Sequence, residues 1–556
     1  MEREKLLRRT DERGVNPLVL GVVRALFLPF FLVYFRLERI GREHVPKTGP
    51  TIFAANHRSF LDPFVISAFV NRPIYFVAKK ELFERPGRFG RLQAWFLNAL
   101  GAFPIDRGAG DDDSMATARR ILERGDAVMI FPEGTRVRPG PLGHPRRGVG
   151  RLALETGAVV VPVAVAGTAN VRRGWRIYPR KVRMRAGRPL RFPKVDRPSP
   201  ALAKGVTDRI WPCVELQWEW LGGTPPLRRA AIVGAGSWGT SLAVTLARAG
   251  LHVELGCRTA AQAGAVAQAR VNERYLPGVT LPEAISVVRA AELDLAQADL
   301  VCLAVPTADL PAAMGQVADR LSPHAGLLVL SKGLVPPGGE LPTAYCTARA
   351  GGRGVACLGG PAHADDALRH GASLVVASAD PELAAQVRYA LADAGFDVQT
   401  TRDVVGVDLA GVAKNAAVLA ATTAAVSGPN ASGAAAGKVF SEVAAYAAAL
   451  GARPQTFAGL AGAGDLVASV VAADGRNRRA GELLARGVPA DEIRPALGHV
   501  AEALDALPLL ASALEARGVR APATHALLDV LEGRESARSF AEHVTAPRRI
   551  VGQRVA

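Results

Sequence analysis

The chain has 556 residues, of which 49% are apolar and 21% charged, with a formal net charge of +17. Its length provides for three or four domains of about 150 residues, and its composition excludes a disordered chain. Five scattered cysteines, without a C-x-x-C pair or a Cys/His cluster, exclude a disulfide framework and a metal site. Residues 1–224 carry 39 Lys and Arg against 21 Asp and Glu (+18), whereas residues 225–556 carry 29 against 30 (−1). Anionic partners are therefore expected for the first half alone.

Residues 17–35 form an apolar run that Arg24 interrupts and Pro29 would kink. A membrane-spanning helix requires about 20 apolar residues, and this run barely reaches that length with a charge inside it. Arginines flank it on both sides. We expect residues 1–42 to associate with an anionic membrane interface through this helix; a buried core helix is the alternative.

Residues 43–221 alternate short apolar strands with helical stretches, which is typical of an α/β domain. Strands are expected at 51–54, 127–131 and 159–165, and a helix at 113–124. The basic stretch that follows has few aromatic residues and no RNA-binding motif, so nucleic acid is not an expected partner.

His57 and Asp62 form an H-x-x-x-x-D pair within the segment NHRSFLD. A neutral imidazole can take a proton from an alcohol while a carboxylate fixes its tautomer and orientation. The alcohol can then attack an acyl thioester directly. No G-x-S-x-G nucleophile motif accompanies the pair.

Four segments occur in a fixed order: NHRSFLDPF, GAFPIDR (101–107), FPEGTR (131–136) and VPVAVAGT (161–168). Together they resemble the glycerolipid acyltransferase family that includes bacterial lysophosphatidate acyltransferases. The resemblance implies His57 as general base, Asp62 as its orienting partner, and acyl-CoA or an acyl-carrier protein as donor. It also implies that Arg107 and Arg136 hold the acceptor phosphate and that Glu133 and Gly134 shape the same pocket.

Residues 222–227, with paired glycines and paired prolines, are the expected linker. Beyond them, near-continuous apolar runs alternate with helices up to residue 403, which indicates a Rossmann-type doubly wound parallel sheet. Residues 404–556 have an Ala-rich helical pattern and are expected to form an all-α C-terminal domain.

Gly234, Gly236 and Gly239 form a G-x-G-x-x-G motif after a strand at 230–233 and before a helix expected at 241–249. This context predicts a dinucleotide with its pyrophosphate at the helix N-terminus. The choice between NAD and NADP stays open. Glu254 lies at the usual spacing for a ribose-binding acid, whereas Arg258 lies nearer the strand end and could meet a 2′-phosphate.

The second half, from residue 229 onward, resembles bacterial NAD(P)-dependent glycerol-3-phosphate dehydrogenases in GAGSWG, LSKGL, GVAKNAAVLA, GLAGAGDLVAS and GRNRRAG. The resemblance implies that Lys414 transfers a proton at the C2 oxygen, that Lys332 hydrogen-bonds near it, and that Asp465 orients the lysine. Burial of Lys414 in an apolar helix would lower its pKa and suit that role. The remaining implied residues are Asn415, Ser469, Arg476 and Asn477 for the substrate, and Ser237, Trp238, Lys332 and Arg476 for the cofactor.

Two segments depart from that family. GPAHADD has Ala362, His363 and Asp366 where Ser or Thr, Phe and Glu are usual, and Asn430 lacks the basic residue that normally follows it. These departures keep two alternatives open: a Rossmann dehydrogenase for another substrate such as a hydroxy acid, and a decayed dehydrogenase that serves as a binding module.

The sequence therefore predicts a bifunctional enzyme of glycerophospholipid synthesis. Its second half would reduce dihydroxyacetone phosphate to sn-glycerol 3-phosphate, and its first half would acylate 1-acyl-glycerol 3-phosphate or glycerol 3-phosphate itself. We expect it in the cytoplasm, peripheral on the inner face of the cell membrane. The oligomeric state is open, with a homodimer as one candidate.

Overall fold

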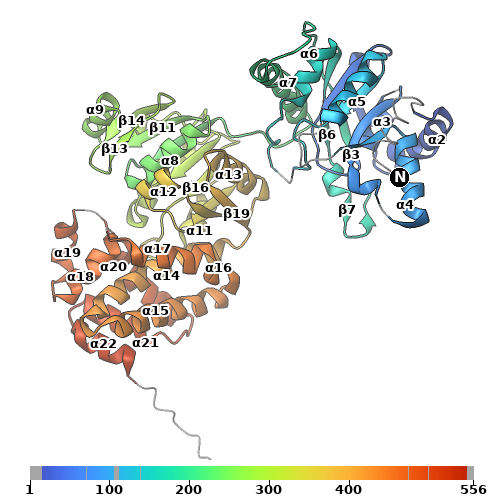
Figure 1. Cartoon of the computed structure of the whole chain (residues 1–556). Coiled ribbons are helices and arrows are strands. Elements are labelled where there is room, and N and C mark those ends of the chain that lie inside the picture. Colours follow the sequence, from blue (N-terminus) through green and yellow to red (C-terminus); the bar gives the residue numbers. More distant parts are fainter. Residues whose placement is uncertain are drawn as a thin grey trace, which may run out of the picture. The chain divides into compact units, whose positions relative to one another are not determined.

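A computed structural model describes residues 15–70, 72–84, 86–105, 112–137, 140–473, 475–498 and 500–546. The chain divides into two compact units, Met1–Pro225 and Pro226–Ala556, each with its own sheet (Figure 1). The division falls between two prolines of the 222–227 segment. Each unit is described by itself.

The first unit is built on a seven-stranded sheet in the order β1-β9-β6-β2-β5-β3-β4. All neighbouring strands are parallel except β6 and β9. The central strands are fully buried, as a parallel sheet between two helical layers requires. The strands are β1 (Glu38–Ile40), β2 (Thr51–Ala55), β3 (Ile74–Lys79), β4 (Ala102–Ile105), β5 (Ala127–Ile130), β6 (Val159–Ala166) and β9 (Arg183–Ala186).

Helices cover both faces of this sheet. One core cluster joins the sheet to α2, α3 and α4, and a second joins it to α5, α6 and α7. A short hairpin, β7 (Arg172–Arg173) and β8 (Arg176–Ile177), projects from the unit (Figure 1). The helices are α2 (Pro17–Val33), α3 (Asp62–Phe69), α4 (Gly87–Ala99), α5 (Asp112–Glu123), α6 (Gly148–Thr156) and α7 (Pro200–Trp220).

The apolar run at 17–35 contributes to the core as well as to the surface. Phe31 and Phe35 are buried, and β1 pairs with β9, so the residues from 31 to 40 belong to the folded domain. A boundary at residue 42, as expected from the sequence, therefore separates β1 from the other strands of its sheet. Arg24, which interrupts the run, donates to the carbonyl oxygens of Ser67 (3.2 Å) and Arg72 (3.1 Å) near the end of α3. This charge faces protein, whereas Leu18, Val22, Leu26, Phe30 and Val33 remain exposed.

The second unit begins with an eight-stranded sheet in the order β14-β11-β10-β15-β16-β17-β18-β19, parallel except between β17 and β18. This is the predicted Rossmann-type architecture. Helices α8, α9, α12 and α13 pack on one face, and α10 and α11 on the other. The strands are β10 (Arg229–Val233), β11 (His252–Cys257), β14 (Ile285–Arg289), β15 (Leu300–Leu303), β16 (Gly326–Val329), β17 (Val355–Gly359), β18 (Ser373–Ser378) and β19 (Asp397–Thr401), and a separate pair is formed by β12 (Val271–Asn272) and β13 (Leu276–Thr280).

The helices of this sheet domain are α8 (Ser237–Arg248), α9 (Ala260–Ala269), α10 (Leu310–Val317), α11 (Pro342–Arg349), α12 (Ala364–His370) and α13 (Pro381–Asp393). The helix expected from residue 241 already begins at Ser237. Since the chain enters it directly from the glycine loop, Gly236 is its N-cap, and the first turn includes Trp238 and Gly239.

An all-helical domain completes the chain, as predicted. Its core centres on α14 (Val404–Thr423), which packs against α15, α17, α18 and α20. The segment Val404–Ser427 is the one single helix, among the described residues, that is long and apolar enough to cross a membrane, but 83% of its most apolar stretch is buried in this domain. The other helices are α15 (Pro429–Ala449), α16 (Pro454–Ala458), α17 (Asp465–Val471), α18 (Arg476–Ala485), α19 (Ala490–Leu497), α20 (Glu502–Ala516), α21 (Pro522–Leu531) and α22 (Ala537–Thr545).

Candidate active sites

The first site lies where three neighbouring strands of the first sheet end. β6, β2 and β5 are adjacent and parallel, so the segments that follow them share one edge of the sheet. His57 follows β2, Phe131 and Glu133 follow β5, and Thr168 follows β6. Ligand sites of open α/β sheets form at this edge.

His57 and Asp62 form a hydrogen-bonded dyad. Asp62 Oδ2 lies 2.9 Å from His57 Nδ1, which leaves the other ring nitrogen for a reacting group. Asp62 is fully buried and accepts three further hydrogen bonds, from the backbone N–H groups of Arg58 (2.6 Å) and Ser59 (2.7 Å) and from the Thr168 hydroxyl (2.6 Å). The His57 ring stacks on Phe131 with centroids 4.1 Å apart. The imidazole is thereby fixed in one orientation and one tautomer.

Glu133 joins the loop after β2 to the loop after β5. Its carboxylate accepts from the backbone N–H of His57 (2.6 Å) and from that of Gly143 (2.8 Å). Burial raises the pKa of Glu133 to about 7, against the pull of these two donors. Its observed contacts are to backbone groups, so it shapes the pocket through the loops that it joins.

The resemblance implies two arginines, Arg107 and Arg136, for the acceptor phosphate. Arg136 is exposed on the loop after β5, and Arg107 lies outside the described residues. Gly134 has φ +70, which favours glycine, and a Cβ there would lie 2.8 Å from Nε of Arg146, so the arginine side chain would have to shift. Arg146 is a guanidinium beside this loop that the sequence reasoning missed. The contact of Thr168 with Asp62 was also missed, although its position directly after a buried strand was a usable signal.

The glycine loop after β10 fits a dinucleotide. Gly234 has φ +110, and a Cβ there would lie 2.5 Å from the Ala304 carbonyl oxygen. At Gly239 a Cβ would meet the Gly234 carbonyl oxygen at 2.0 Å, whereas at Gly236 it would meet nothing within 4 Å. Two glycines thus allow close backbone packing, and the third leaves open space at the N-terminus of α8, where a pyrophosphate binds in such folds.

The two candidates for the adenosine ribose differ in position. Glu254 lies within β11 and already accepts from the backbone N–H of Asp294 at 2.7 Å. Arg258 directly follows the last residue of β11 and is exposed. The strand end therefore presents a guanidinium rather than a carboxylate.

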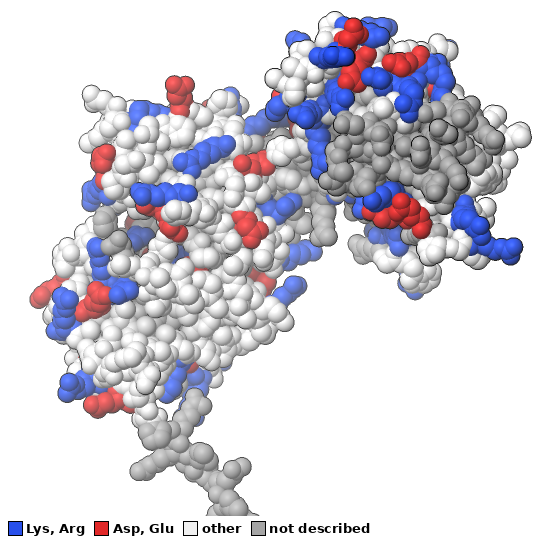
Figure 2. Space-filling view, in the orientation of Figure 1, with Lys and Arg blue, Asp and Glu red and all other residues white. Residues whose placement is uncertain are grey.

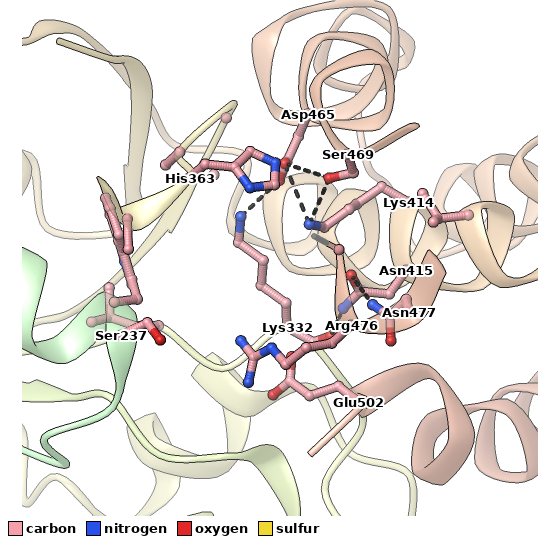
Figure 3. A pocket seen from close by; sticks show the side chains of 18 of the residues that line it. Ser237, Lys332, His363, Lys414, Asn415, Asp465, Ser469, Arg476, Asn477 and Glu502 are labelled. Atoms are coloured by element: carbon pink, nitrogen blue, oxygen red, sulfur yellow. Dashed lines mark hydrogen bonds and ion pairs between the residues drawn. The ribbon is translucent and has the colours of Figure 1, made fainter. Parts of the chain in front are cut away.

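A cluster of two lysines and one carboxylate occupies the wall of a cavity of about 300 Å³. Lys332 Nζ donates to Asp465 Oδ2 at 2.7 Å, and Lys414 Nζ lies 3.4 Å from Oδ1 of the same residue. Lys414 also donates to the Ser469 hydroxyl at 3.1 Å. The three charged residues come from different segments, after β16, in α14 and at the start of α17, and their side chains converge (Figure 3).

Burial and charge act in opposite directions in this cluster. Burial lowers the pKa of Lys414, and neighbouring Lys332 lowers it further, while Asp465 raises it in part. Burial raises the pKa of Asp465, but the two lysines outweigh that effect and the pKa is lowered overall. The result is an ionised carboxylate beside an ammonium group that gives up its proton more readily than an ordinary lysine, as proton transfer requires.

Two asparagines connect the elements of this site. Asn415 donates to the Lys332 carbonyl oxygen at 2.7 Å and accepts from Asn477 at 2.8 Å. Asn477 in turn accepts from the backbone N–H of Ala503 at 3.2 Å. Both side chains therefore hold α14, α18 and α20 together around the cavity. Arg476 lines the cavity and donates to the Val500 carbonyl oxygen at 3.2 Å.

The cavity brings together most of the residues expected for the second site. Gly234, Gly236, Gly239 and Arg258 lie outside its lining, toward the ends of β10 and β11. Glu502 lines it and accepts from the Thr307 backbone N–H (3.3 Å) and hydroxyl (3.2 Å); no sequence signal pointed to it. His363, one of the departures from the family pattern, also lines the cavity. The expected residues in the lining are Ser237, Trp238, Lys332, Lys414, Asn415, Asp465, Ser469, Arg476 and Asn477.

Comparison with known proteins assigns the two units to different families. Residues 36–166 match the Acyltransferase family. Residues 229–384 and 403–542 match the N-terminal and C-terminal parts of NAD-dependent glycerol-3-phosphate dehydrogenase.

Individual relatives agree with the second assignment. The chain is 36% identical over 312 residues to the glycerol-3-phosphate dehydrogenase (NAD(P)+) of Geobacillus kaustophilus, a match that covers 55% of this chain and 90% of that protein. It is 38% identical over 316 residues to the enzyme of the same name from Deinococcus radiodurans, with 56% and 93% covered. The crystal structure of glycerol-3-phosphate dehydrogenase from Coxiella burnetii superimposes with a TM-score of 0.54 at 26% identity, and covers 57% of this chain and 98% of that one.

Proposed function

We propose that this chain is a bifunctional enzyme of glycerophospholipid synthesis. The chain belongs to the NAD(P)-dependent glycerol-3-phosphate dehydrogenase family, and an acyltransferase domain precedes its dehydrogenase domains. The second unit reduces dihydroxyacetone phosphate to sn-glycerol 3-phosphate. The first transfers an acyl group to a glycerol-phosphate acceptor. The Lys332–Asp465–Lys414 cluster, centred on a buried carboxylate beside the dinucleotide loop, carries the assignment of the second unit.

In the second unit the side chains of the cluster supply the proton and position the substrate. The glycine loop would hold a nicotinamide dinucleotide, which would supply hydride chemistry for the C2 carbon of the ketone. Lys414 donates a proton to the C2 oxygen, and Asp465 keeps that lysine oriented and charged between turnovers. Lys332 hydrogen-bonds at the same oxygen, and Arg476 holds the phosphate. The intact cluster supports an active dehydrogenase over a decayed binding module, and the family match supports glycerol 3-phosphate over a hydroxy acid.

In the first unit the acceptor alcohol is the nucleophile. Nε2 of His57 takes the hydroxyl proton while the alcohol oxygen attacks the thioester carbonyl, and Asp62 stabilises the imidazolium that forms. Collapse of the tetrahedral intermediate breaks the carbon–sulfur bond. The proton passes from His57 to the leaving thiolate, so that an ester and a free thiol result. Arg136 and Arg107 bind the acceptor phosphate.

The acceptor and donor can be tested directly. We propose 1-acyl-glycerol 3-phosphate as acceptor, with glycerol 3-phosphate as the other candidate, and acyl-CoA or an acyl-carrier protein as donor. The purified chain should be given both acceptors side by side, with each donor, in the presence and absence of NAD(P)H and dihydroxyacetone phosphate. Absence of acyl transfer to either acceptor would refute the assignment of the first unit.

The cofactor preference rests on Arg258. We propose that its guanidinium meets the 2′-phosphate of NADP, since it occupies the end of β11 where the adenosine ribose binds in this fold. Arg258→Ala should raise the KM for NADPH about tenfold and leave that for NADH nearly unchanged, because it removes one charge-assisted contact. An equal change in both KM values would place Arg258 away from the ribose.

We also propose that the chain is peripheral on the inner, cytoplasmic face of the cell membrane. The exposed side of α2 and the +18 balance of residues 1–224 support this. Truncation at Arg42 would remove core residues, so Leu26→Gln with Val22→Gln is the cleaner test. The double variant should bind anionic vesicles less well than the wild type. Unchanged binding, or binding that salt does not weaken, would contradict the proposal. A homodimer stays a candidate that the mass in solution decides.

A further inference from the structure

A row of exposed or partly exposed aromatic and aliphatic side chains, linked through the Ile177 carbonyl and the Arg172 guanidinium, runs from α2 to the loop that carries His57. We call Phe30, Tyr34, Trp175, Ile177 and Phe60 the aromatic surface. It is separate from the catalytic contacts described above, and no step of the proposed chemistry uses it.

The contacts along the aromatic surface are specific. Phe30 of α2 stacks on Tyr34 with ring centroids 4.9 Å apart. The Tyr34 hydroxyl donates to the carbonyl oxygen of Ile177 in β8 at 2.8 Å. Arg172 of β7 lies opposite Ile177 in the hairpin, and its guanidinium lies 5.6 Å from the centroid of the Phe60 ring. The hairpin thus joins the end of α2 to the catalytic loop.

Large apolar side chains remain uncovered along this row. Trp175 at the hairpin turn is 83% exposed, and Phe30, Phe60 and Ile177 are between 40% and 46% exposed. Phe60 lies in the loop between His57 and Asp62, so the row ends on the loop that carries the general base. Exposed apolar groups that adjoin one another mark a site for a protein or a membrane.

The charges beside the aromatic surface favour a membrane. The hairpin carries the exposed residues Arg172 and Arg176, and Arg180 follows it. Arg176 lies over the Trp175 ring at 5.3 Å, and Arg36 donates to the Pro179 carbonyl oxygen at 3.4 Å. Tryptophan and arginine side chains both bind at the headgroup layer of a membrane. The indole ring contacts the acyl region, and the guanidinium binds lipid phosphate.

We propose that the aromatic surface lies in the headgroup layer of an anionic bilayer and guides the acyl chain of a lipid substrate to His57. The proposal rests on the acyltransferase function proposed above. α2 provides the broad contact, and the β7–β8 hairpin provides a second one on the catalytic side. Phe60 is then the last apolar side chain that the lipid passes before it reaches the dyad.

Vesicle binding by the full chain tests the hairpin. Trp175→Ser should weaken partition into phosphatidylcholine–phosphatidylglycerol vesicles about tenfold, the loss expected for one large buried aromatic group. Trp175→Tyr should retain most of the binding. Trp220→Ser is the matched control, since Trp220 is also exposed (65%) but belongs to α7 and stacks with Arg185 of β9, neither of which is part of the hairpin. Urea unfolding, followed by signals of the first unit, reports that this unit is folded in each variant. Wild-type binding by Trp175→Ser, or an equal loss with Trp220→Ser, would overturn the proposal.

Chain-length dependence tests Phe60. In Phe60→Ser the KM for a long-chain lysophosphatidate in vesicles should rise about tenfold relative to that for a short-chain, monomeric acceptor. An equal loss of kcat on both acceptors would mean that Phe60 acts on the dyad, and would overturn its role. If Trp175→Ser lost only the rate with an acidic acyl-carrier protein and kept vesicle binding, the surface would belong to that protein instead. A wild-type chain inactive on every acceptor would refute the acyltransferase function, while vesicle binding would still test the surface.

Discussion

The two units of this chain each use one buried aspartate to hold a proton-carrying side chain, but they hold it by different means. Asp62 is fixed by donors from its own loop, two backbone N–H groups and His57, with the Thr168 hydroxyl from a neighbouring strand end. Asp465 is fixed by two ammonium groups, one from the sheet domain and one from the helical domain. The first arrangement is local, and the second exists only when two domains of the unit pack together.

Because of this difference, substitutions affect the two sites in different ways. In the first unit the dyad residues lie five positions apart, and the contacts from outside their loop come from Phe131, Glu133 and Thr168. In the second unit the cluster joins residues 133 positions apart, and a lost charge alters the proton affinity of every other member. The two units also differ in charge: acidic and basic side chains are interspersed on the face of the second unit drawn in Figure 2, in keeping with its −1 balance.

The largest expected effect is at His57. His57→Ala should reduce acyl transfer by about 10³- to 10⁴-fold, since it removes the general base. Dehydrogenase turnover should not change, because the units have separate cores. Both rates should be measured on one preparation. Comparable loss of both would show that the units are not independent.

A somewhat smaller loss is expected at Lys414. Lys414→Ala should lower kcat for ketone reduction by about 10²- to 10³-fold, the usual scale for a positioned proton donor, with little change in cofactor affinity. Acyl transfer by the same variant serves as the control. Near-normal turnover would refute the dehydrogenase assignment.

The pKa of Glu133 in the first unit is raised, whereas that of Asp465 in the second unit is lowered, so the two carboxyl groups affect stability in opposite ways as pH changes. The pKa of Glu133 is raised from 4.5 to about 7 by burial, so the folded state binds the proton more tightly than the unfolded state. The corresponding stability is fully present below pH 4.5 and is lost as pH rises through about 7, a change of about 3 kcal/mol.

Glu133→Gln should remove this slope. Urea unfolding at a series of pH values, followed by signals of the first unit, measures it. If the wild type gained stability between pH 4.5 and 7 relative to Glu133→Gln, the carboxylate would be ionised in the folded state and the prediction would be wrong.

The smallest expected change is a shift in a pH profile. Ketone reduction requires protonated Lys414, so its rate should fall as pH rises through the lowered pKa of that lysine. Asp465→Asn removes the group that raises this pKa, and the alkaline limb should move to lower pH. The reverse, oxidative reaction should rise with pH over the same range. An unmoved limb would assign it to another group.

Much of the fold follows from patterns of short range. Buried apolar strands separated by helices predicted both parallel sheets, and the paired Gly and Pro residues lie where the two units divide. The helix after the glycine loop begins four residues earlier than expected because its N-cap is a loop glycine rather than a Ser, Thr, Asp or Asn.

The sites show a similar division. His57 and Asp62 were expected together because both lie in one loop, and the G-x-G-x-x-G spacing led directly to the tight turn at Gly234. Arg146 and Glu502 were not expected in these positions, since nothing in their neighbouring residues marks them, whereas the contact of Thr168 was missed although a buried strand precedes it. Family resemblance brought Lys332, Lys414 and Asp465 together; spacing alone would not have done so.

By itself the sequence determined the two halves, their fold classes, the dyad and the glycine loop, because each depends on residues within about ten positions of one another. Only the tertiary structure decided which partners meet across longer separations. In that structure Arg24 donates to carbonyl groups near the end of α3, and the hairpin contacts Tyr34. Phe31 and Phe35 are buried in the sheet domain, whereas Leu26 is exposed. Local preferences set each element, whereas the contacts between distant elements depend on how their apolar faces pack.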